Sequence, residues 1–165
     1  MNKRTFLKLG IGSLGLVGIA ELLGIKLFPG DALANSTFEV TKSESEWRKI
    51  LSPGQYYVLR MKGTELPNSS PLDKEYRAGT FLCAGCQLPL FSSKAKYDSG
   101  TGWPSFTKPI SGAIATSVDN SFFMTRTEVH CRRCGGHLGH VFLDNRSASG
   151  SRYCMNGLAL KFVAS

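Results

Sequence analysis

The distribution of apolar and polar residues predicts two short helices at the start of the folded part of the chain. Ser43 stands three residues before Glu46, a capping-box pattern that predicts a helix beginning there. Pro53 suits the first turn of a second helix, whose apolar residues are 56–59. Residues 63–79 are rich in Pro, Asn, Ser and Asp, which predicts a loop.

Beyond residue 79, short apolar runs are separated by turn residues, a pattern typical of antiparallel strands. The segments expected to form strands are 80–82, 113–118, 122–129, 141–143 and 158–163, and residues 88–91 lead away from the first cysteine turn. Residues 113–118 and 122–129 are expected to pair as a hairpin across Asp119-Asn120-Ser121, and residues 94–99 to be irregular. The sequence therefore predicts a mainly β domain preceded by short N-terminal helices.

Residues 1–34 differ in character from the rest of the chain. A basic start precedes an apolar run over residues 9–20, and an Ala-x-Ala cleavage site ends at Ala34. This arrangement predicts an export signal over residues 1–34, a mature domain over residues 35–165 and a periplasmic location. Lys3-Arg4 resembles a twin-arginine export signal with Lys in place of the first Arg.

The alternative for this segment is an uncleaved membrane anchor. Residues 9–28 are long enough to span a bilayer. Glu21 and Lys26 interrupt the span, however, and charges within a bilayer are costly. Cleavage is therefore favoured, and membrane attachment is expected only if the segment stays in place.

Composition and charge add nucleic-acid binding to the functions to be considered. The chain has 165 residues, of which 42% are hydrophobic, and this suits one domain with an ordinary core. Its formal net charge is +8, and removal of residues 1–34, with four basic and two acidic residues, leaves +6. A basic domain with paired cysteines could bind nucleic acid, so a zinc-containing nucleic-acid module is a rival hypothesis.

Four of the five cysteines form two pairs at metal-ligand spacing, Cys83-x-x-Cys86 and Cys131-x-x-Cys134. Together the pairs fit a tetrahedral zinc site with four cysteine ligands that joins distant parts of the domain. Four sulfur ligands leave no position for substrate, so the zinc is expected to be structural. Two disulfides, or a redox-active pair, are the alternative in an exported protein. His130 and His137 flank the second pair but are not needed as ligands.

Cys154 is the one cysteine without a partner at such spacing. A lone cysteine is more often an inert, buried residue than a nucleophile. Arg152 and Asn156, however, would share its face if the segment is a strand. A cysteine attacks as the thiolate, which a nearby guanidinium favours.

Other segments offer side chains that a nucleophilic cysteine would use. His137 and His140 could protonate a leaving oxygen near neutral pH, and the indole face of Trp103 could receive a methyl group. Each also has a structural interpretation, namely hydrogen bonding for the histidines and packing for the tryptophan. No single residue decides between the two interpretations.

Five motifs in a fixed order add a resemblance to a known family. They are Cys83-Ala-Gly-Cys86, Gly100-Thr-Gly-Trp-Pro-Ser-Phe106, Cys131-Arg-Arg-Cys134, His137-Leu-Gly-His-Val-Phe142 and Arg152-Tyr-Cys-Met-Asn-Gly157. In this order they resemble the B-type peptide-methionine (R)-S-oxide reductases, from about Glu39 to the C-terminus. The resemblance implies an antiparallel, tent-like β architecture similar to the Mss4-like superfamily. It also implies an enzyme that reduces methionine (R)-sulfoxide in proteins to methionine.

The same resemblance implies roles for individual residues. Cys154 is the expected nucleophile and is left as a sulfenic acid after methionine is released. His140 and His137 are expected to hydrogen-bond and protonate the sulfoxide oxygen, with Asn156 helping to hold it. The expected substrate-binding residues are Trp103, Phe142 and Arg152, with the S-methyl group on the indole face of Trp103.

One position departs from the family pattern. Many relatives have a second, resolving cysteine immediately before Gly-Trp-Pro-Ser-Phe, where this chain has Thr101. No cysteine remains outside the two zinc pairs to reduce the sulfenic acid. We therefore expect recycling by an external thiol, either a thioredoxin-like reductase or a small thiol.

The expected partners follow from this hypothesis. Oxidised proteins or peptides are the substrates of a monomeric enzyme that binds no nucleic acid. The nucleic-acid hypothesis leaves Cys154 and the paired histidines unexplained. A third hypothesis is a non-catalytic zinc module of the same superfamily, which explains the fold but gives Cys154 no function.

Overall fold

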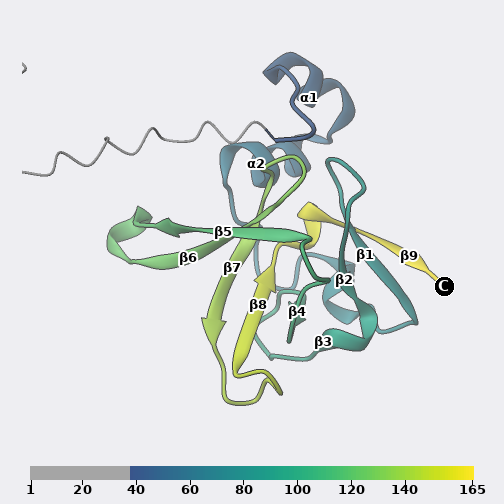
Figure 1. The fold of residues 1–165 in the computed structure, drawn as a ribbon, viewed down its shortest axis with the longest axis vertical. Helices are drawn as coiled ribbons and strands as arrows, with labels where there is room; N and C mark the ends of the chain where they lie inside the picture. Colours follow the sequence, from purple (N-terminus) through teal and green to yellow (C-terminus); the bar gives the residue numbers. More distant parts are fainter. Residues whose placement is uncertain (1–37) are drawn as a thin grey trace, which may run out of the picture. The chain divides into compact units, whose positions relative to one another are not determined.

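Figure 1 shows a computed structural model that describes residues 38–165. Two helices, α1 (Glu44–Ile50) and α2 (Pro53–Met61), precede two antiparallel sheets. The first sheet has the strand order β2 (Pro89–Ser92), β1 (Gly79–Cys83), β9 (Leu160–Ala164). The second has the order β3 (Lys96–Tyr97), β4 (Ser105–Phe106), β8 (Ser151–Met155), β7 (His137–Leu143), β6 (Arg126–Cys131), β5 (Ile114–Asp119). The predicted mainly β, antiparallel class with short N-terminal helices is confirmed.

Both helices begin with a capping box, and the first was predicted. The Ser43 hydroxyl accepts a hydrogen bond from the Glu46 backbone N–H, and the Glu46 carboxylate accepts one from the Ser43 N–H. Ser52 and Gln55 repeat the arrangement at α2, where Pro53 occupies the first turn. These reciprocal bonds satisfy backbone N–H groups that have no partner within the helix.

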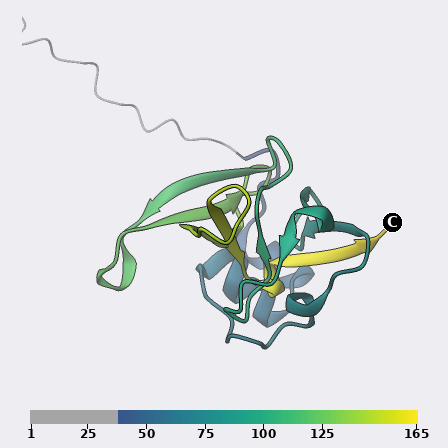
Figure 2. The same ribbon diagram turned by 90° about the horizontal axis from the view of Figure 1, so that it is seen from below.

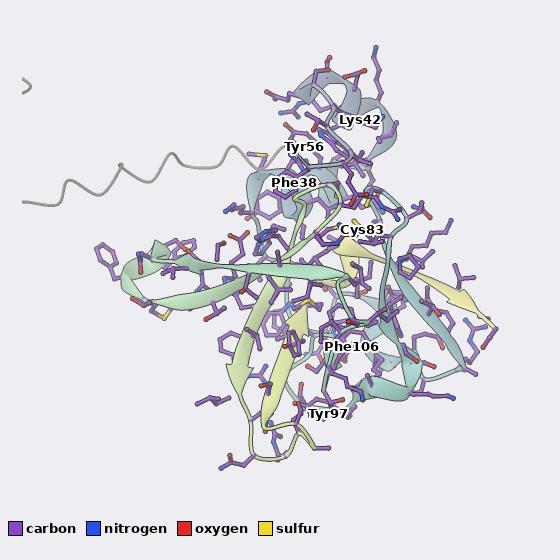
Figure 3. All side chains as sticks on the ribbon, in the orientation of Figure 1. Phe38, Lys42, Tyr56, Cys83, Tyr97 and Phe106 are labelled. Atoms are coloured by element: carbon purple, nitrogen blue, oxygen red, sulfur yellow. The ribbon has the colours of Figure 1, made fainter. Side chains whose placement is uncertain are left out.

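Phenylalanines fill the space between the two sheets. Phe106 on β4 stacks on Phe91 of β2 with ring centroids 4.3 Å apart, and meets Phe81 of β1 edge-on at 5.0 Å. All three rings are fully buried. Figure 3 shows Phe106 deep among the strands, with Cys83 and Tyr97 toward opposite ends. Burial of these rings is the main apolar contact that holds one sheet on the other.

The helices cover the two turns that contain the paired cysteines. Trp47 of α1 and Leu59 of α2 are buried and pack against Gly85 in the first cysteine turn. Leu59 also contacts Gly136, just after the second turn. The contact is close, because a Cβ added at Gly136 would lie 3.0 Å from the Leu59 side chain.

The predicted β5–β6 hairpin exists, but its turn differs from the prediction. Strand β6 begins at Arg126 rather than at Phe122, and a tight turn spans Ser121–Phe123. Phe122 and Phe123 adopt left-handed backbone conformations with φ of 54° and 58°. Their apolar side chains suggested strand, whereas backbone geometry makes them the hairpin tip (Figures 1 and 2).

Several other boundaries differ from the predictions. Strand β7 begins at His137 instead of residue 141, and the short strands β3 and β4 were not predicted. Additional 3-10 turns lie at Pro71–Lys74, Ser93–Ala95 and Gly157–Ala159. Strands of two residues such as β3 and β4 are too short to show an alternation of apolar and polar residues, so only their pairing with neighbouring strands identifies them.

Within residues 38–165, no helix has both the length and the apolar character needed to cross a membrane. The predicted export signal over residues 1–34 lies outside the described residues.

Candidate active site and metal centre

Cys154 belongs to a row of side chains that crosses the six-stranded sheet. Strand register places His140 of β7 opposite Cys154 on one side and Ser105 of β4 opposite it on the other. The row continues through Glu128, opposite His140, to Ser117, opposite Glu128. Directly opposed residues project from the same face of a sheet, so five segments of the chain contribute to one surface.

A β-bulge adds His137 to this face. Residues three apart on a regular strand point to opposite faces, but the register of β6 and β7 shifts between Val129 and His130. The bulge leaves Leu138 as the extra residue, so His137 and His140 both point toward the side of Glu128. Their ring centroids lie 5.3 Å apart. The bulge is therefore the local feature that brings the two predicted histidines together.

Each histidine is hydrogen-bonded to a carboxylate. His140 Nε2 lies 2.7 Å from Asp119 Oδ2, and His137 Nδ1 lies 2.8 Å from Glu128 Oε1. A carboxylate accepts hydrogen bonds, so His140 carries a proton on Nε2 and His137 carries one on Nδ1. Neither carboxylate was predicted from the sequence, although Glu128 stands in a predicted strand where a charged residue facing inward needs a partner.

The surroundings keep these carboxylates ionised. Hydrogen bonds from Ser121 and His140 hold the pKa of Asp119 well below its usual range. Burial acts to raise the pKa of Glu128, but hydrogen bonds from Lys62, His137 and Ser117 outweigh it and lower the pKa to about 2. Burial also lowers the pKa of His137, which is therefore neutral near pH 7.

Cys154 is partly buried, and burial raises the pKa of its thiol above the ordinary value. The positive charge of Arg152 and hydrogen bonds from the hydroxyls of Thr101 and Ser105 act in the opposite direction. The expected effect of Arg152 on the thiol is thus present, but it does not overcome burial. The thiol is the main resting form at neutral pH.

Three hydroxyl groups form a chain beside the sulfur. Ser99 Oγ lies 2.8 Å from Thr101 Oγ1 and 2.7 Å from Ser105 Oγ. Ser99 and Ser105 are both buried. Thr101, the position of the resolving cysteine in many relatives, therefore contacts Cys154 as part of a hydrogen-bonded group of hydroxyls.

A pocket of about 140 Å³, here called the reaction pocket, opens at Cys154. Its lining residues are Thr64, Trp103, Arg126, Gly139, His140, Phe142, Cys154 and Asn156. The structure thus brings five of the seven predicted catalytic and substrate-binding residues around one space. His137 and Arg152 do not line it.

Arg152 lies behind Phe142 rather than in the reaction pocket. Its guanidinium carbon is 4.8 Å from the centroid of the Phe142 ring, and its Nε is 3.3 Å from Asp144 Oδ2. Arg146 and Tyr97 also bind Asp144. Arg152 therefore supports the aromatic wall and acts on Cys154 through its charge.

Asn156 fixes the bulge that positions the histidines. Its backbone N–H and its side-chain Nδ2 both donate to the Leu138 carbonyl, at 2.8 and 3.1 Å. Its Oδ1 accepts a hydrogen bond from the Glu65 backbone N–H at 2.9 Å. These contacts give Asn156 a structural role, and its role in holding the substrate oxygen stays a prediction.

Glu65 is a site residue that the sequence did not indicate. Its backbone carbonyl accepts the Trp103 indole N–H at 3.1 Å, which fixes the ring at the reaction pocket. Its buried carboxylate accepts backbone N–H groups from Gly157 and Leu158 at 2.6 and 2.9 Å. A glutamate in a loop gives no periodic signal, so only the fold reveals this contact.

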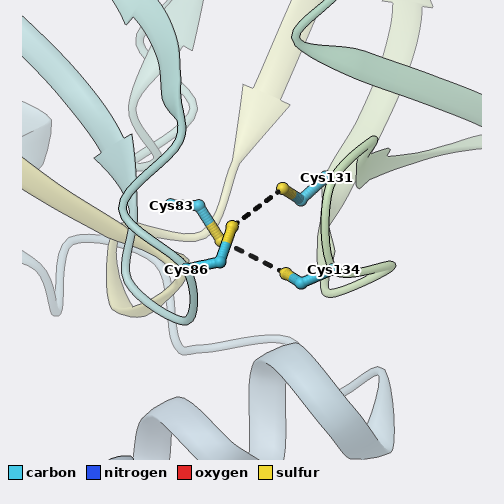
Figure 4. A group of neighbouring side chains, drawn as sticks. All are labelled: Cys83, Cys86, Cys131 and Cys134. Carbon is cyan, nitrogen blue, oxygen red and sulfur yellow. Dashed lines mark hydrogen bonds between the residues drawn. The ribbon is translucent and has the colours of Figure 1, made fainter. Parts of the chain in front are cut away.

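The four paired cysteines meet in space and could hold one metal ion. Their sulfur atoms all lie within 4.8 Å of one another, with Cys83 Sγ 3.7 Å from Cys134 Sγ and Cys86 Sγ 3.5 Å from Cys131 Sγ (Figure 4). Tetrahedral zinc with bonds of about 2.3 Å requires sulfur separations of about 3.8 Å, whereas a disulfide requires about 2 Å. All five cysteines are free, so the sulfur positions fit a metal and not the alternative of two disulfides.

The two cysteine turns have matching backbone geometry. Gln87 donates its N–H to the Cys83 carbonyl at 2.8 Å, and Gly135 donates to Cys131 at 2.9 Å. Both donors have left-handed φ, of 61° and 66°. One turn follows β1 and the other follows β6, so a bound ion would join the two sheets. The group of four contains neither His130 nor His137.

Comparison with known proteins adds independent findings. Residues 51–164 match the model of the SelR domain. The chain is 53% identical over 133 residues to a peptide methionine sulfoxide reductase MsrB from Bradyrhizobium diazoefficiens, covering 79% of this chain and 96% of that protein. Proteins of the same name from Leptospira interrogans and Methanosarcina barkeri are 50% identical over 126 residues and 52% identical over 124 residues. These alignments cover 76% and 74% of this chain, and 96% and 87% of the relatives.

Proposed function

Because this chain belongs to the SelR-domain family of MsrB-type peptide methionine sulfoxide reductases, it reduces methionine sulfoxide, and we propose that Cys154 is the nucleophile. The observation that supports this role is the position of Cys154 in the reaction pocket, between His140 and the hydroxyls of Thr101 and Ser105. The metal-type cysteines are grouped elsewhere, so Cys154 is free to react.

The proposed reaction transfers the substrate oxygen to the enzyme. The Cys154 sulfur attacks the sulfoxide sulfur and forms a sulfur–sulfur bond. The sulfur–oxygen bond of the substrate then breaks as the protonated oxygen moves to the Cys154 sulfur, the sulfur–sulfur bond breaks, and methionine leaves with its sulfur reduced by two electrons. Cys154 is oxidised by the same two electrons and is left as a sulfenic acid. Two external thiols then restore it, forming one disulfide and one water.

His140 is proposed as the group that protonates the sulfoxide oxygen. It lines the reaction pocket directly opposite Cys154, and Asp119 fixes its ring through Nε2. His137 does not line the reaction pocket, and burial favours its neutral form, so it is not the proposed proton donor. Its proposed contribution is to hold the position of the neighbouring ring.

Substrate orientation is proposed to rest on the aromatic residues. The S-methyl group lies against Trp103, with Phe142 supported from behind by Arg152. Selectivity for the (R) epimer is part of the proposal and follows the family. It is tested by comparing reduction of methionine (R)-sulfoxide and (S)-sulfoxide derivatives.

The decisive experiment measures reduction of dabsyl-methionine (R)-sulfoxide with dithiothreitol. Wild-type protein is expected to be active, and Cys154→Ser to lose activity, since an alcohol is a far weaker nucleophile than a thiolate. The melting temperature of the variant serves as the folding control. Activity that survives in Cys154→Ser would refute the assignment.

Recycling is proposed to use an external thiol, either a thioredoxin-like reductase or a small thiol. The chain has five cysteines, four of which form the metal-type group. Mass spectrometry after one turnover without reductant should find an oxidised Cys154 and four unmodified cysteines. A disulfide between Cys154 and any of the four would contradict this route.

We also propose that the group of four cysteines binds one structural zinc ion. A thiolate set at tetrahedral spacing suits zinc, and four protein ligands leave no position for substrate. Metal analysis should give one zinc per chain, and Cys154→Ser should retain it. Loss of zinc in Cys154→Ser would show that the nucleophile has been assigned wrongly.

For location, we propose export to the periplasm with cleavage after Ala34, and membrane attachment if the segment is retained. The support is the basic start, apolar run and Ala-x-Ala site of the sequence. N-terminal sequencing of the exported protein should begin at Asn35. Protein that retains Met1 and stays in the cytoplasm would contradict the proposal.

A further inference from the structure

The tip of the β5–β6 hairpin exposes a cluster of apolar side chains, here called the apolar tip. Its members are Val118, Phe122, Phe123 and Met124. Phe123 is fully exposed and Phe122 is 78% exposed. Figures 1 and 2 show the hairpin extending away from the remaining strands in both views. Large apolar groups gathered on a surface mark a contact site more often than single exposed ones do.

The backbone of the apolar tip is also unusual. Phe122 and Phe123 both have left-handed φ, where glycine or asparagine is favoured and a bulky aromatic is strained. Such strain concentrates where the displayed side chain has a function. Here the strained residues present two aromatic rings to solvent.

A second cavity lies beside the apolar tip and continues the reaction pocket. It measures about 230 Å³ and is lined by Met61 and Phe122 among other residues. Thr64, Arg126 and His140 line both spaces. A chain whose oxidised methionine occupies the reaction pocket can therefore place a neighbouring residue in the second cavity.

The charges of the second cavity are balanced within the protein. Lys62 lies 2.7 Å from Glu128, and Arg126 lies 2.7 Å from Asp119. No net charge is left to attract a charged side chain, whereas Met61 and Phe122 offer apolar contact.

We propose that the second cavity and the apolar tip bind the polypeptide that flanks the oxidised methionine, with an apolar residue next to it. This inference rests on the proposed function and adds a subsite for the residue next to the oxidised methionine. The apolar tip covers the flanking residue, and the second cavity receives its side chain.

The test compares kcat/KM for three substrates. They are N-acetyl-methionine sulfoxide amide, a peptide with Leu on both sides of methionine sulfoxide, and the same peptide with Asp on both sides. The Leu peptide should exceed the amide by about tenfold, the gain expected from burial of one apolar side chain. The Asp peptide should show little advantage over the amide.

The variant is Phe122→Asn with Phe123→Asn, because asparagine keeps the left-handed turn while removing both rings. It should remove most of the Leu-peptide advantage. Ile50→Ser removes an exposed apolar residue from α1 and should leave the advantage intact. If the double variant proves unstable, Phe123→Asn alone gives the same comparison, since Phe123 is fully exposed.

Several outcomes would overturn the proposal. One is an unchanged Leu-peptide advantage in the double variant, and another is equal kcat/KM for the Leu and Asp peptides. Tip-dependent binding to phosphatidylglycerol vesicles, with the peptide advantage unchanged, would assign the apolar tip to a membrane instead. Failure of wild-type protein on all three substrates would contradict the proposed function itself.

Discussion

At the scale of single residues, two opposing influences act on the pKa of Cys154, the proposed nucleophile. Burial raises the pKa of Cys154, while Arg152, Thr101 and Ser105 act to lower it. A thiol kept mostly protonated resists adventitious oxidation, since the thiolate is the reactive form. The cost is a lower thiolate fraction before substrate binds.

The pKa of the resting thiol should therefore lie above that of an ordinary cysteine, and alkylation measures this directly. Because the pKa is raised, the rate of Cys154 alkylation by iodoacetamide should rise about tenfold from pH 7 to pH 8 and should still be rising at pH 8. Arg152→Gln should be slower at each pH, because a charge that lowers the pKa is lost. Arg152→Lys is the charge-preserving control. Rates read by peptide mass spectrometry that level off below pH 8 would contradict the prediction.

Asp119 should matter for the rate more than for substrate affinity. In Asp119→Asn the ionised partner of His140 Nε2 is lost, so the ring is no longer held in its tautomer. We expect kcat to fall about 10- to 100-fold with a smaller change in KM. Lys74→Gln, which breaks an exposed ion pair elsewhere, is the control. An unchanged kcat would mean that His140 needs no carboxylate.

At the scale of elements, the site depends on close contact between β7 and β8. Gly139 of β7 is paired with Met155 of β8. A Cβ at Gly139 would collide with the Cys154 carbonyl oxygen and lie 3.0 Å from the Met155 Cα. Both obstacles are backbone atoms, which cannot move aside as a flexible side chain can.

Gly139→Ala should therefore push the two strands apart. We expect a loss of about 2 kcal/mol or more in the free energy of unfolding, with activity reduced as His140 moves away from Cys154. Gly150→Ala is the matched control, because open space surrounds that position and only its left-handed φ is penalised, by about 1 kcal/mol. Denaturant titration of both variants measures the difference, and equal losses would contradict the steric argument.

Elements defined by local chemistry were predictable from the sequence, and those defined by pairing were not. The Ser43 capping box and the two cysteine pairs depend on residues three apart, so the sequence displays them directly. The bulge at Leu138 and the contacts of Glu65 depend on segments far apart in the chain. At the apolar tip, local reasoning failed because Phe122 is apolar without being in a strand.

At the scale of the whole described domain, the group of four cysteines joins the same two sheets that the phenylalanine core joins. Cys83 ends β1 of the three-stranded sheet, and Cys131 ends β6 of the six-stranded sheet. The helices close over both cysteine turns through Trp47 and Leu59. A metal bound here would hold the two sheets together and would also fix the cysteine turns on which the helices pack.

Removal of the ion should therefore unfold much of the domain. Structural zinc contributes a binding free energy of about 10 kcal/mol, comparable with the total stability of a domain, about 5–15 kcal/mol. Cys131→Ser, or wild-type protein treated with a strong chelator, should lose cooperative thermal unfolding by circular dichroism. Cys154→Ser should melt like wild type. A chelated protein with an unchanged melting temperature would contradict the structural role.

Side chains alternate between the two faces of a strand, so the row of opposed side chains depends on the register of β7 and β8. A shift by an odd number of residues would place Cys154 on the opposite face of the sheet from His140. Sliding β8 by one position would turn Cys154 inward and present Tyr153 or Met155 to His140. A one-residue insertion within β7 or β8 would thus move Cys154 or His140 to the opposite face of the sheet. An insertion in the loop between the strands, residues 144–150, leaves their register unchanged. In this sheet the loop between β7 and β8 can therefore change length without moving Cys154 away from His140, whereas the two strands cannot.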